Sequence, residues 1–420
     1  MQLTNKQEEG LKIAVERYKV GMPYTCISGY AGSGKSTLVK FIVAALNIPD
    51  EKVAYVAYTG KAANVLKNKG CPNATTAHKL IYYPRQLPNG SFVFKPKPFL
   101  VNENNERYKL IVVDEVSMLP ADMWFLLLSY GIYILATGDP GQLGPIQKDG
   151  DEDQCNHVLD SPHVFLDEIM RQAQESAIIR LSMHIREGKD FRTFPTVSGE
   201  VRIIPSRWNF PDENDTCLQA SQIICGTNAR RIDLNSKIRS LKGYGPEPTI
   251  EDKIIGLTNH WDCVSIQGNA LTNGAIGNIV EYEPKKLQTY PERLKIKPTE
   301  LMYTNMFTED EDSFDNLPID YQCLKTGKPS LTPREEYQLR GYIKSMMLKG
   351  TPEELKRLPA MPYQFNYGYA ITCWKAQGSE WPYVLGYDAV WLLKKSKEEY
   401  TRYMYTLVTR ASKAIILVGE

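Results

Sequence analysis

Residues 29–37 read Gly-Tyr-Ala-Gly-Ser-Gly-Lys-Ser-Thr and fit the pattern G-x-x-x-x-G-K-[S/T] in full. The apolar run from Tyr24 to Ser28 precedes this stretch, and Leu38 to Ala45 continues it with the apolar spacing of an amphipathic helix. Strand, glycine-rich loop and helix in this order form the context in which the pattern binds phosphate. A glycine-rich turn that binds nothing is the alternative. The stretch therefore predicts a nucleoside triphosphate site in an α/β domain.

The residue types of this loop explain how it would hold a triphosphate. Glycines let successive backbone N–H groups face phosphate oxygens, and the N-terminus of the next helix adds partial positive charge. We expect Lys35 to neutralise the β and γ oxygens and Ser36 to ligate Mg²⁺. The remaining expected contacts to the nucleotide are Gly32, Ser33, Gly34 and Thr37.

A second apolar run, Tyr108 to Val113, ends in two acidic residues, Asp114 and Glu115. Acidic side chains at the carboxyl end of a core strand lie beside the phosphate loop of such domains. We expect Asp114 to hold Mg²⁺ and Glu115 to orient the attacking water. A surface Asp-Glu pair is the structural alternative, and the phosphate loop makes that alternative less favourable.

A third apolar run, Gly131 to Thr137, is followed by Gly-Asp-Pro-Gly-Gln at positions 138–142. The amide of Gln142 has the hydrogen-bonding groups needed to sense a γ-phosphate. Gly-Asp-Pro-Gly alone would also pass as an ordinary turn.

Composition limits the class of protein. The 420 residues are 42% hydrophobic and 24% charged, which predicts two or three soluble globular domains. A net charge of +1 excludes a protein that holds nucleic acid by bulk positive charge, so such contacts must use a local groove, stacking and backbone donors. The eight cysteines occur singly, which argues against a zinc site or a disulfide framework and favours the cytoplasm. The apolar stretch between Asp122 and Asp139 is too short for a membrane helix.

Several further segments, taken in order, resemble one family. Asp114 to Met118 and Gly138 to Ile146 are similar to motifs II and III of superfamily 1 helicases, specifically the superfamily 1B, RecD/Dda-like branch. The other segments that resemble motifs of this family are Ala57–Ala63 (Ia), Thr75–His78 (Ib), Met170–Gln172 (IV), Tyr369–Glu380 (V) and Tyr405–Ala411 (VI). The resemblance therefore extends over almost the whole chain.

The resemblance implies two RecA-like motor domains, each a parallel sheet flanked by helices, with ATP and Mg²⁺ bound in the cleft between them. The expected domains are 1–81 with 108–164 (first motor domain), 82–107 (β-hairpin pin), 165–251 with 359–420 (second motor domain) and 252–358 (SH3-like β insertion). The Asn-Gly turn at 89–90 favours the hairpin in the pin, and Leu271 to Val280 is also interpreted as a hairpin. Runs at Gln222–Cys225 and Ala414–Val418 predict strands of the second motor domain.

The resemblance also assigns roles around the nucleotide. Arg171 and Arg410 would act as arginine fingers on the γ-phosphate, and a surface salt bridge is the alternative for each. Glu380 would lie near the ribose or the phosphates. Gln7 resembles an adenine-reading glutamine, and it equally completes a capping box with Thr4.

For a nucleic acid strand, the resemblance points to motifs Ia, Ib and V. The expected contacts are Thr59, Lys61, Thr76, His78, Thr372, Trp374, Lys375 and Gln377. Hydroxyls, amides and a few cations contact phosphates without reading bases, as sequence-independent movement along a strand requires. Helix capping is the alternative for Thr59. Trp374 departs from the histidine usual in this family, and its indole would either stack on a base or pack between the domains.

The expected activity is an ATP-driven DNA helicase that moves 5′ to 3′ along single-stranded DNA and unwinds duplex. We expect a cytoplasmic monomer without membrane contact, acting at the duplex fork with replication or recombination proteins. Two other classes stay open: a P-loop ATPase that remodels a protein, and a nucleic-acid clamp that uses ATP as a latch. RNA stays open as the track, because backbone and stacking contacts do not discriminate sugars.

Overall fold

The computed structural model describes residues 3–71, 73–86, 92–145, 155–169, 175–204 and 210–419. The chain divides into two units. Unit 1 comprises Met1–Ile81, Lys97–Leu234 and Ala370–Glu420, and unit 2 comprises Tyr82–Pro96 and Asn235–Tyr369. In the described part of the chain, no helix is both long and apolar enough to cross a membrane.

The phosphate loop of unit 1 follows a central strand of a six-stranded sheet with the order β3-β2-β6-β7-β1-β8. All pairings in this sheet are parallel. The strands are β1 (Tyr24–Gly29), β2 (Val53–Ala57), β3 (Ala74–Thr76), β6 (Leu110–Val113), β7 (Tyr133–Gly138) and β8 (Val164–Leu166). Strands β6 and β7 are buried along their whole length, which explains their continuous apolar sequences.

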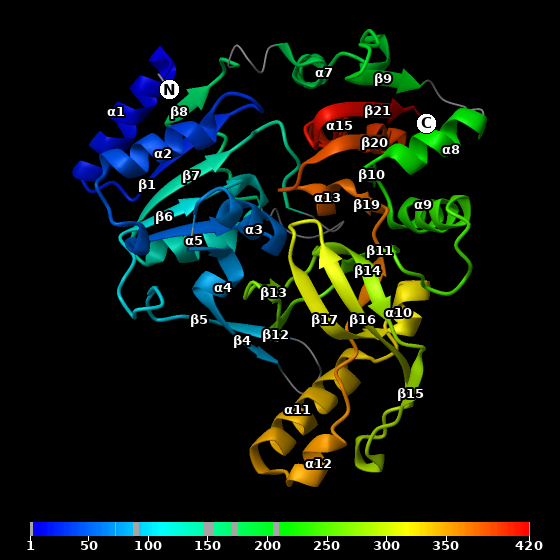
Figure 1. Cartoon of the computed structure of the whole chain (residues 1–420). Coiled ribbons are helices and arrows are strands. Elements are labelled where there is room, and N and C mark those ends of the chain that lie inside the picture. The colour runs from blue at the N-terminus through cyan, green and yellow to red at the C-terminus, as the bar shows by residue number, and fades with distance from the viewer. Residues whose placement is uncertain are drawn as a thin grey trace. The chain divides into compact units, whose positions relative to one another are not determined.

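Helices cover this first sheet (Figure 1). They are α1 (Asn5–Lys19), α2 (Lys35–Ala45), α3 (Gly60–Asn68), α4 (Ala77–Ile81) and α5 (Ala121–Ser129), with 3₁₀ turns η1 (Asp50–Lys52) and η2 (Val116–Met118). Side chains of α1 and α2, such as Ala14 and Leu38, share one apolar core with Ile27 of β1 and Leu135 of β7. Burial of this core fixes α2, and with it the phosphate loop, against the sheet.

A second parallel sheet of unit 1 has the order β19-β10-β20-β21-β9. Its strands are β9 (Val201–Ile204), β10 (Gln222–Cys225), β19 (Ala370–Thr372), β20 (Trp381–Tyr387) and β21 (Ala411–Val418). Its helical segments are α7 (Ala177–Arg186), η3 (Phe191–Thr193), α8 (Phe210–Gln219), α9 (Asn228–Leu241), α13 (Cys373–Ala376), α14 (Val390–Leu393) and α15 (Lys397–Val408). Two parallel sheets with helices confirm the expected α/β class.

Unit 2 is built mainly from antiparallel strands. Strands β15-β16-β14-β11-β18 form one sheet, and β17 pairs with β16. The strands of unit 2 are β4 (Tyr82–Gln86), β5 (Phe92–Pro96), β11 (Lys253–Gly256), β12 (His260–Val264), β13 (Ala270–Leu271), β14 (Ile276–Tyr282), β15 (Lys286–Gln288), β16 (Thr299–Thr308), β17 (Ser313–Asp320) and β18 (Phe365–Tyr367). Its helical segments are η4 (Glu292–Leu294), α10 (Tyr321–Thr326), α11 (Pro333–Lys349) and α12 (Pro352–Lys356).

Three expected domain boundaries differ from the structure. The second motor domain does not begin at residue 165, because β8 pairs with β1 and belongs to the first sheet. The insertion does not end at residue 358, because β18 pairs with β11. The excursion from the first motor domain ends at Pro96 and not at residue 107, because residues from Lys97 onward group with unit 1. Strands of three residues carry little pattern, so pairing with distant segments decides where they belong.

The hairpin expected at Leu271–Val280 is wrong. The turn itself is present, since Gly274 has a φ of +91°. However, β13 before the turn pairs with β12, whereas β14 after it pairs with β11 and β16. Burial of Ile276 and Ile279 of β14 explains why this strand joins the larger sheet. By contrast, β4 and β5 pair antiparallel from Tyr82↔Pro96 to Gln86↔Phe92, and the expected turn at 88–90 lies outside the described residues.

Candidate nucleotide and nucleic-acid site

The phosphate loop connects β1 to α2 through two left-handed glycines. Gly32 and Gly34 have φ values of +77° and +80°, which side chains disfavour, so the loop needs glycine at both positions. The Lys35 Nζ donates hydrogen bonds to the carbonyl oxygens of Gly29 at 2.7 Å and Tyr30 at 3.0 Å. These bonds hold the amine against the same loop whose backbone would surround the phosphates. Gly32 and Ser36 are exposed, and Thr37 is half-buried.

The two acidic residues after β6 have different surroundings. Asp114 Oδ1 accepts a hydrogen bond from the Thr137 hydroxyl at 2.8 Å. Glu115 has left-handed backbone angles, φ 50° and ψ 51°, a conformation that non-glycine residues adopt at a cost of about 1 to 3 kcal/mol. Its Oε2 is shielded from solvent and has no hydrogen-bond partner. The strained backbone therefore places an unsatisfied carboxylate oxygen at the carboxyl end of the sheet.

The pKa of Glu115 shows which groups lie around it. Burial raises this pKa, while the positive charges of Arg410 and Lys35 act in the opposite direction. The charges of Asp114 and Asp139 raise it further. A carboxylate with a raised pKa is better suited to accept a proton near neutral pH. The structure thus brings together groups from the phosphate loop, motifs II and III, and motif VI.

Arg410 follows α15 and is 5% exposed. Its guanidinium donates to Thr406 O at 3.0 Å, to Ser379 O at 3.1 Å and to Thr409 Oγ1 at 3.0 Å. Arg410 is therefore buried, and its hydrogen bonds described here go to two carbonyl oxygens and a hydroxyl instead of a surface carboxylate. The other expected arginine finger, Arg171, lies outside the described residues, together with the rest of motif IV.

The loop after β7 contacts elements of the second sheet. Gln142 is 9% exposed, and its N–H donates to Asp139 O at 3.2 Å. The next N–H, of Leu143, donates to the Thr406 hydroxyl at 2.9 Å. The carbonyl of Leu143 accepts a hydrogen bond from Gln377 Nε2 at 2.7 Å. These two bonds connect motif III directly to motifs VI and V.

Gln377 therefore does not have the position that we expected. We assigned it to a nucleic acid strand, but its side chain is only 2% exposed and donates to Leu143. Gly378 beside it has a φ of +74°, and a Cβ at this position would lie 2.7 Å from Ala62 Cβ. A buried amide and a glycine in close contact indicate that this part of motif V packs against motifs Ia and III.

Gln7 fulfils the capping interpretation and also contacts the phosphate loop. The Thr4 hydroxyl accepts the Gln7 N–H at 3.3 Å, and Gln7 Oε1 accepts the Thr4 N–H at 3.0 Å. In addition, Gln7 Nε2 donates to Ser33 O at 3.3 Å, and the side chain is 1% exposed. The capping box thus fixes a glutamine beside the loop. Glu380 is exposed and directly precedes β20.

The expected threonine contacts are mainly structural. The Thr59 hydroxyl caps α3 by accepting the Ala62 N–H at 3.2 Å. The Thr76 hydroxyl accepts the Lys79 N–H at 3.2 Å, and Thr76 is 8% exposed. Thr372 is also buried, at the N-terminus of α13. Thr76 and Thr372 are therefore too buried to offer a strand the contacts that we expected.

The remaining expected contacts to a strand are partly exposed cations and aromatic rings. Lys61 Nζ lies 4.4 Å from the ring centre of Trp381, and Trp374 packs at 5.9 Å against Tyr403. Burial lowers the pKa of His78, which makes its ring neutral at pH 7. Burial, with a smaller effect from Arg231, lowers the pKa of Lys375 to about 8.

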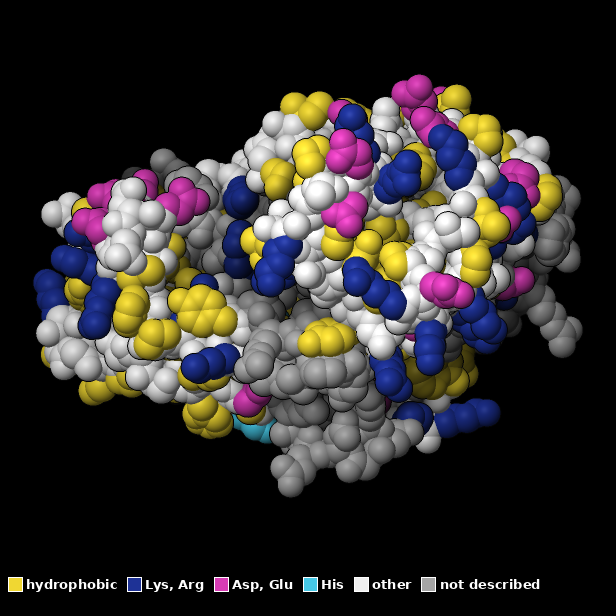
Figure 2. All heavy atoms as spheres, turned by 90° about the horizontal axis from the view of Figure 1, so that it is seen from below, with side chains coloured by type: hydrophobic (Ala, Val, Ile, Leu, Met, Phe, Trp, Pro, Cys, Tyr) yellow, Lys and Arg dark blue, Asp and Glu magenta, His cyan; other side chains and the backbone are white. Residues whose placement is uncertain are grey.

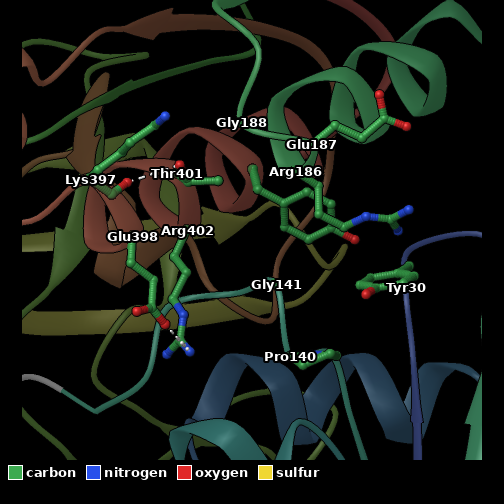
Figure 3. A pocket seen from close by; sticks show the side chains of 11 residues that line it. Tyr30, Pro140, Gly141, Arg186, Glu187, Gly188, Lys397, Glu398, Thr401 and Arg402 are labelled. Carbon is green, nitrogen blue, oxygen red and sulfur yellow. Dashed lines mark hydrogen bonds and ion pairs between the residues drawn. The ribbon is translucent and has the colours of Figure 1, made fainter.

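A cavity of about 530 Å³ opens beside the phosphate loop (Figure 3). Its wall includes Tyr30 of the loop, Gly141 of motif III and residues near the end of α7 and the start of α15. The Arg186 guanidinium lies 3.4 Å from the ring centre of Tyr30, and its Nη1 is shielded from solvent without a hydrogen-bond partner. Arg402 instead pairs with Glu398 at 2.8 Å. No sequence motif marked Arg186, because its position depends on how α7 packs.

The residues present fit Mg²⁺ bound through a nucleotide. Among the described residues, no cluster of three or more His, Cys, Asp or Glu side chains is arranged to hold a metal ion. Mg²⁺ commonly takes one or two protein oxygens and completes its shell with water and phosphate oxygens. Ser36 and Asp114 supply such oxygens, and the buried Ser33 hydroxyl, which lacks a partner, is a further unsatisfied polar group in the loop.

Comparisons with known proteins agree with this arrangement. Residues 2–203 match the family described as an AAA domain, and residues 367–418 match a UvrD-like helicase C-terminal domain. The chain is 24% identical over 363 residues to the ATP-dependent RecD2 DNA helicase of Deinococcus radiodurans, covering 86% of this chain and 42% of that protein. It is 24% identical over 192 residues to the ATP-dependent DNA helicase dda of phage T4, covering 44% of this chain and 43% of that protein.

The chain therefore spans less than half the length of these curated relatives. A solved structure, the Pif1 helicase from Bacteroides in complex with ADP-AlF₃ and ssDNA, aligns over 99% of this chain and 92% of that chain. The TM-score is 0.54 at 14% identity, which supports a shared fold with RecA-like domains. The motifs and the two matched families place the chain with the superfamily 1B helicases of the RecD/Dda-like group.

Proposed function

We propose that this chain is an ATP-dependent DNA helicase that moves 5′ to 3′ along single-stranded DNA and unwinds duplex. One observation carries the proposal: a buried, unsatisfied Glu115 carboxylate under the combined charges of Lys35 and Arg410. Lys35 begins helix α2, which packs on the first sheet, and Arg410 lies directly before β21 of the second sheet. A site shared in this way changes when the two sheets move relative to each other, which is how hydrolysis would drive movement.

The proposed chemistry is attack of water on the γ-phosphorus of ATP. Glu115 accepts a proton from the water, while the bond between the γ-phosphorus and the β–γ bridging oxygen breaks, which yields ADP and inorganic phosphate. Lys35 balances charge on the β and γ oxygens, and the Arg410 guanidinium leaves its backbone acceptors to stabilise the transition state. Ser36 and Asp114 would hold Mg²⁺, which would supply further charge neutralisation. Arg171 is proposed as a second arginine finger on the γ-phosphate, and Gln142 as its sensor. Gln7 is proposed to contact the adenine, and Glu380 the ribose or the phosphates.

We propose Thr59, Lys61, His78, Trp374 and Lys375 as the contacts to the DNA strand. All of them are at least partly exposed. A neutral His78 can donate one hydrogen bond or stack, whereas Lys375 changes charge near pH 8. On the face drawn in Figure 2, the described Lys and Arg side chains are interspersed with acidic and hydrophobic ones. Such a mixed surface favours a local binding groove over a broad basic area.

Two parts of unit 2 have proposed roles at the duplex fork. The antiparallel pair β4–β5 lies in the chain between motifs Ib and II, where a wedge that separates the strands is expected from the family resemblance. The antiparallel strands between α9 and β19 are the proposed SH3-like insertion. Tyr83 and Phe94 of the β4–β5 pair are exposed aromatic side chains that such a wedge would present to a base pair.

The decisive experiment measures ATP hydrolysis with and without single-stranded DNA, and then unwinding of partial duplexes with a 5′ or a 3′ overhang. We expect stimulation by single-stranded DNA and preferential unwinding from the 5′ overhang. Better unwinding from the 3′ overhang would overturn the polarity. Hydrolysis that single-stranded DNA leaves unchanged would favour a protein-remodelling ATPase, and DNA binding without turnover would favour a latch. The same measurement with an RNA strand of equal sequence tests whether the protein prefers DNA or RNA.

The remaining proposals concern the oligomeric state, the partners and the cellular compartment. We propose a monomer that acts on a duplex fork and cooperates with replication or recombination proteins. The cysteines described here are all free, which fits a reducing compartment such as the cytoplasm. Analytical ultracentrifugation with and without forked DNA tests the monomer.

A further inference from the structure

Tyr405 of α15 forms a direct connection between the phosphate loop and the loop after β7. Its hydroxyl accepts a hydrogen bond from the Ala31 N–H at 2.9 Å and donates one to Asp139 Oδ2 at 2.7 Å. The side chain is 1% exposed. Burial, followed by the charge of Asp139, raises the pKa of the hydroxyl well above its ordinary value. The hydroxyl therefore stays protonated and can serve both partners at once.

The connection continues from Asp139 toward motif V. The other carboxylate oxygen of Asp139 accepts the Gly141 N–H at 2.9 Å, which fixes the turn of this loop. A Cβ on Gly141 would lie 3.0 Å from the Tyr405 ring, so the loop packs directly against it. The same loop then reaches Leu143, whose carbonyl accepts the hydrogen bond from Gln377. Each step is a hydrogen bond or a short loop segment, from the loop that would hold phosphates to the segment proposed to hold DNA.

The neighbouring Tyr403 provides a comparison within the same helix. It is also buried, but its hydroxyl donates to Tyr387 O at 2.8 Å, inside the second sheet. Removal of the Tyr403 hydroxyl eliminates one buried hydrogen bond, and removal of the Tyr405 hydroxyl eliminates two of similar length. Only the Tyr405 hydroxyl, however, bonds to the phosphate loop and to motif III. The two tyrosines therefore separate the effect of losing a buried hydrogen bond from the effect of losing the connection.

A cavity lies beside the contact between Tyr405 and the phosphate loop. The 530 Å³ cavity beside the loop is lined by Tyr30, Gly141 and Tyr405, so part of this contact borders open space instead of close packing. A loop that closes around phosphates must reorient its backbone N–H groups, among them that of Ala31. Because the Ala31 N–H is bonded to Tyr405, such a change would alter the hydrogen bonds of the Tyr405 hydroxyl to Ala31 and to Asp139.

We propose that Tyr405 is a positioning residue that couples occupancy of the phosphate loop to DNA affinity at the segment 372–377, through Asp139, Leu143 and Gln377. The inference rests on the proposed function, because it requires both ATP and single-stranded DNA as ligands. Coupling of this kind is reciprocal, so nucleotide must change the affinity for DNA by the same factor as DNA changes the affinity for nucleotide. The ratio of the DNA affinities with and without nucleotide therefore measures this coupling.

The experiment compares Tyr405→Phe with Tyr403→Phe as the matched control. Fluorescence anisotropy of a labelled oligonucleotide gives the dissociation constant without nucleotide and with ADP plus aluminium fluoride. We expect Tyr405→Phe to reduce the ratio of these constants by about tenfold, which corresponds to about 1.4 kcal/mol. Tyr403→Phe should keep the wild-type ratio, although its melting temperature falls. A wild-type ratio in Tyr405→Phe, or an equal loss in both variants, would overturn the proposal.

A further variant covers the case in which Tyr405→Phe does not fold. Asp139→Ala removes the acceptor at the other side of the hydroxyl and should reduce the same ratio, and an unchanged ratio would again overturn the role of Tyr405. The wild-type protein separates the two proposals. If it neither hydrolyses ATP nor binds single-stranded DNA, the proposed function fails. If it does both and the variants keep its ratio, only the coupling through Tyr405 fails.

Discussion

Substitution of Gly378 by alanine tests how closely motif V must approach motif Ia. Two effects add at this position. The φ of +74° costs an L residue about 1 to 2 kcal/mol. The new methyl group would lie 2.7 Å from Ala62 Cβ, and overpacking of this kind costs about 1 to 3 kcal/mol. The total expected loss of stability is about 2 to 5 kcal/mol.

Gly131→Ala is the matched control, because Gly131 has a φ of +66° and nothing within 4 Å of the added Cβ. It should therefore show only the conformational cost of about 1 to 2 kcal/mol. Thermal unfolding followed by circular dichroism gives both melting temperatures, and ATP hydrolysis is then measured at a temperature where both variants are folded. We expect Gly378→Ala to unfold at a lower temperature than Gly131→Ala and to lose stimulation by single-stranded DNA. Equal melting temperatures and equal stimulation would refute the close-contact argument.

Three further outcomes are expected. Lys35→Ala should reduce ATP turnover to background in a phosphate-release assay, since it removes the amine that is held against the phosphate loop. Normal turnover would contradict the site. Glu115→Gln should bind a fluorescent ATP analogue normally yet fail to hydrolyse ATP. In the wild type, the rate of ATP hydrolysis should fall as pH decreases through the raised pKa of Glu115, because only the ionised carboxylate accepts a proton. DNA affinity should fall severalfold as pH rises through 8, where Lys375 loses its charge, and an anisotropy titration of Lys375→Arg should show a flat profile instead.

The sequence predicted those features whose physical cause is local. The phosphate loop needs glycines at left-handed positions and a helix directly after them, and both are visible in nine consecutive residues. Strands β6 and β7 are buried on both faces, so their apolar runs are continuous and easily recognised. The capping box at Thr4 involves residues only three positions apart. The α/β class and the placement of Lys35, Asp114 and Glu115 followed from these elements, whereas Arg410 was expected only from the resemblance.

Features that depend on distant partners were not predictable in the same way. Strand β8 has three residues and is defined only by its pairing with β1. Strand β14 lies next to a valid turn but pairs with β11 and β16, since burial and not turn chemistry selects its partners. Gln377 has an amide that could contact a phosphate, yet this amide is buried and donates to the carbonyl oxygen of Leu143. The position of such a side chain is determined by packing between elements that the chain order keeps apart.

The strand order of the second sheet has a consequence for synthesis on the ribosome. Strands β9 and β10 emerge first, but they do not neighbour each other, and their partners β19, β20 and β21 follow only after residues 235–369. At a translation rate of about 5 to 20 residues per second, β10 waits on the order of ten seconds for its first neighbour. During this interval its unpaired edges are open to wrong pairing. We therefore expect chaperones to assist the nascent chain at a stage when its first sheet is already complete.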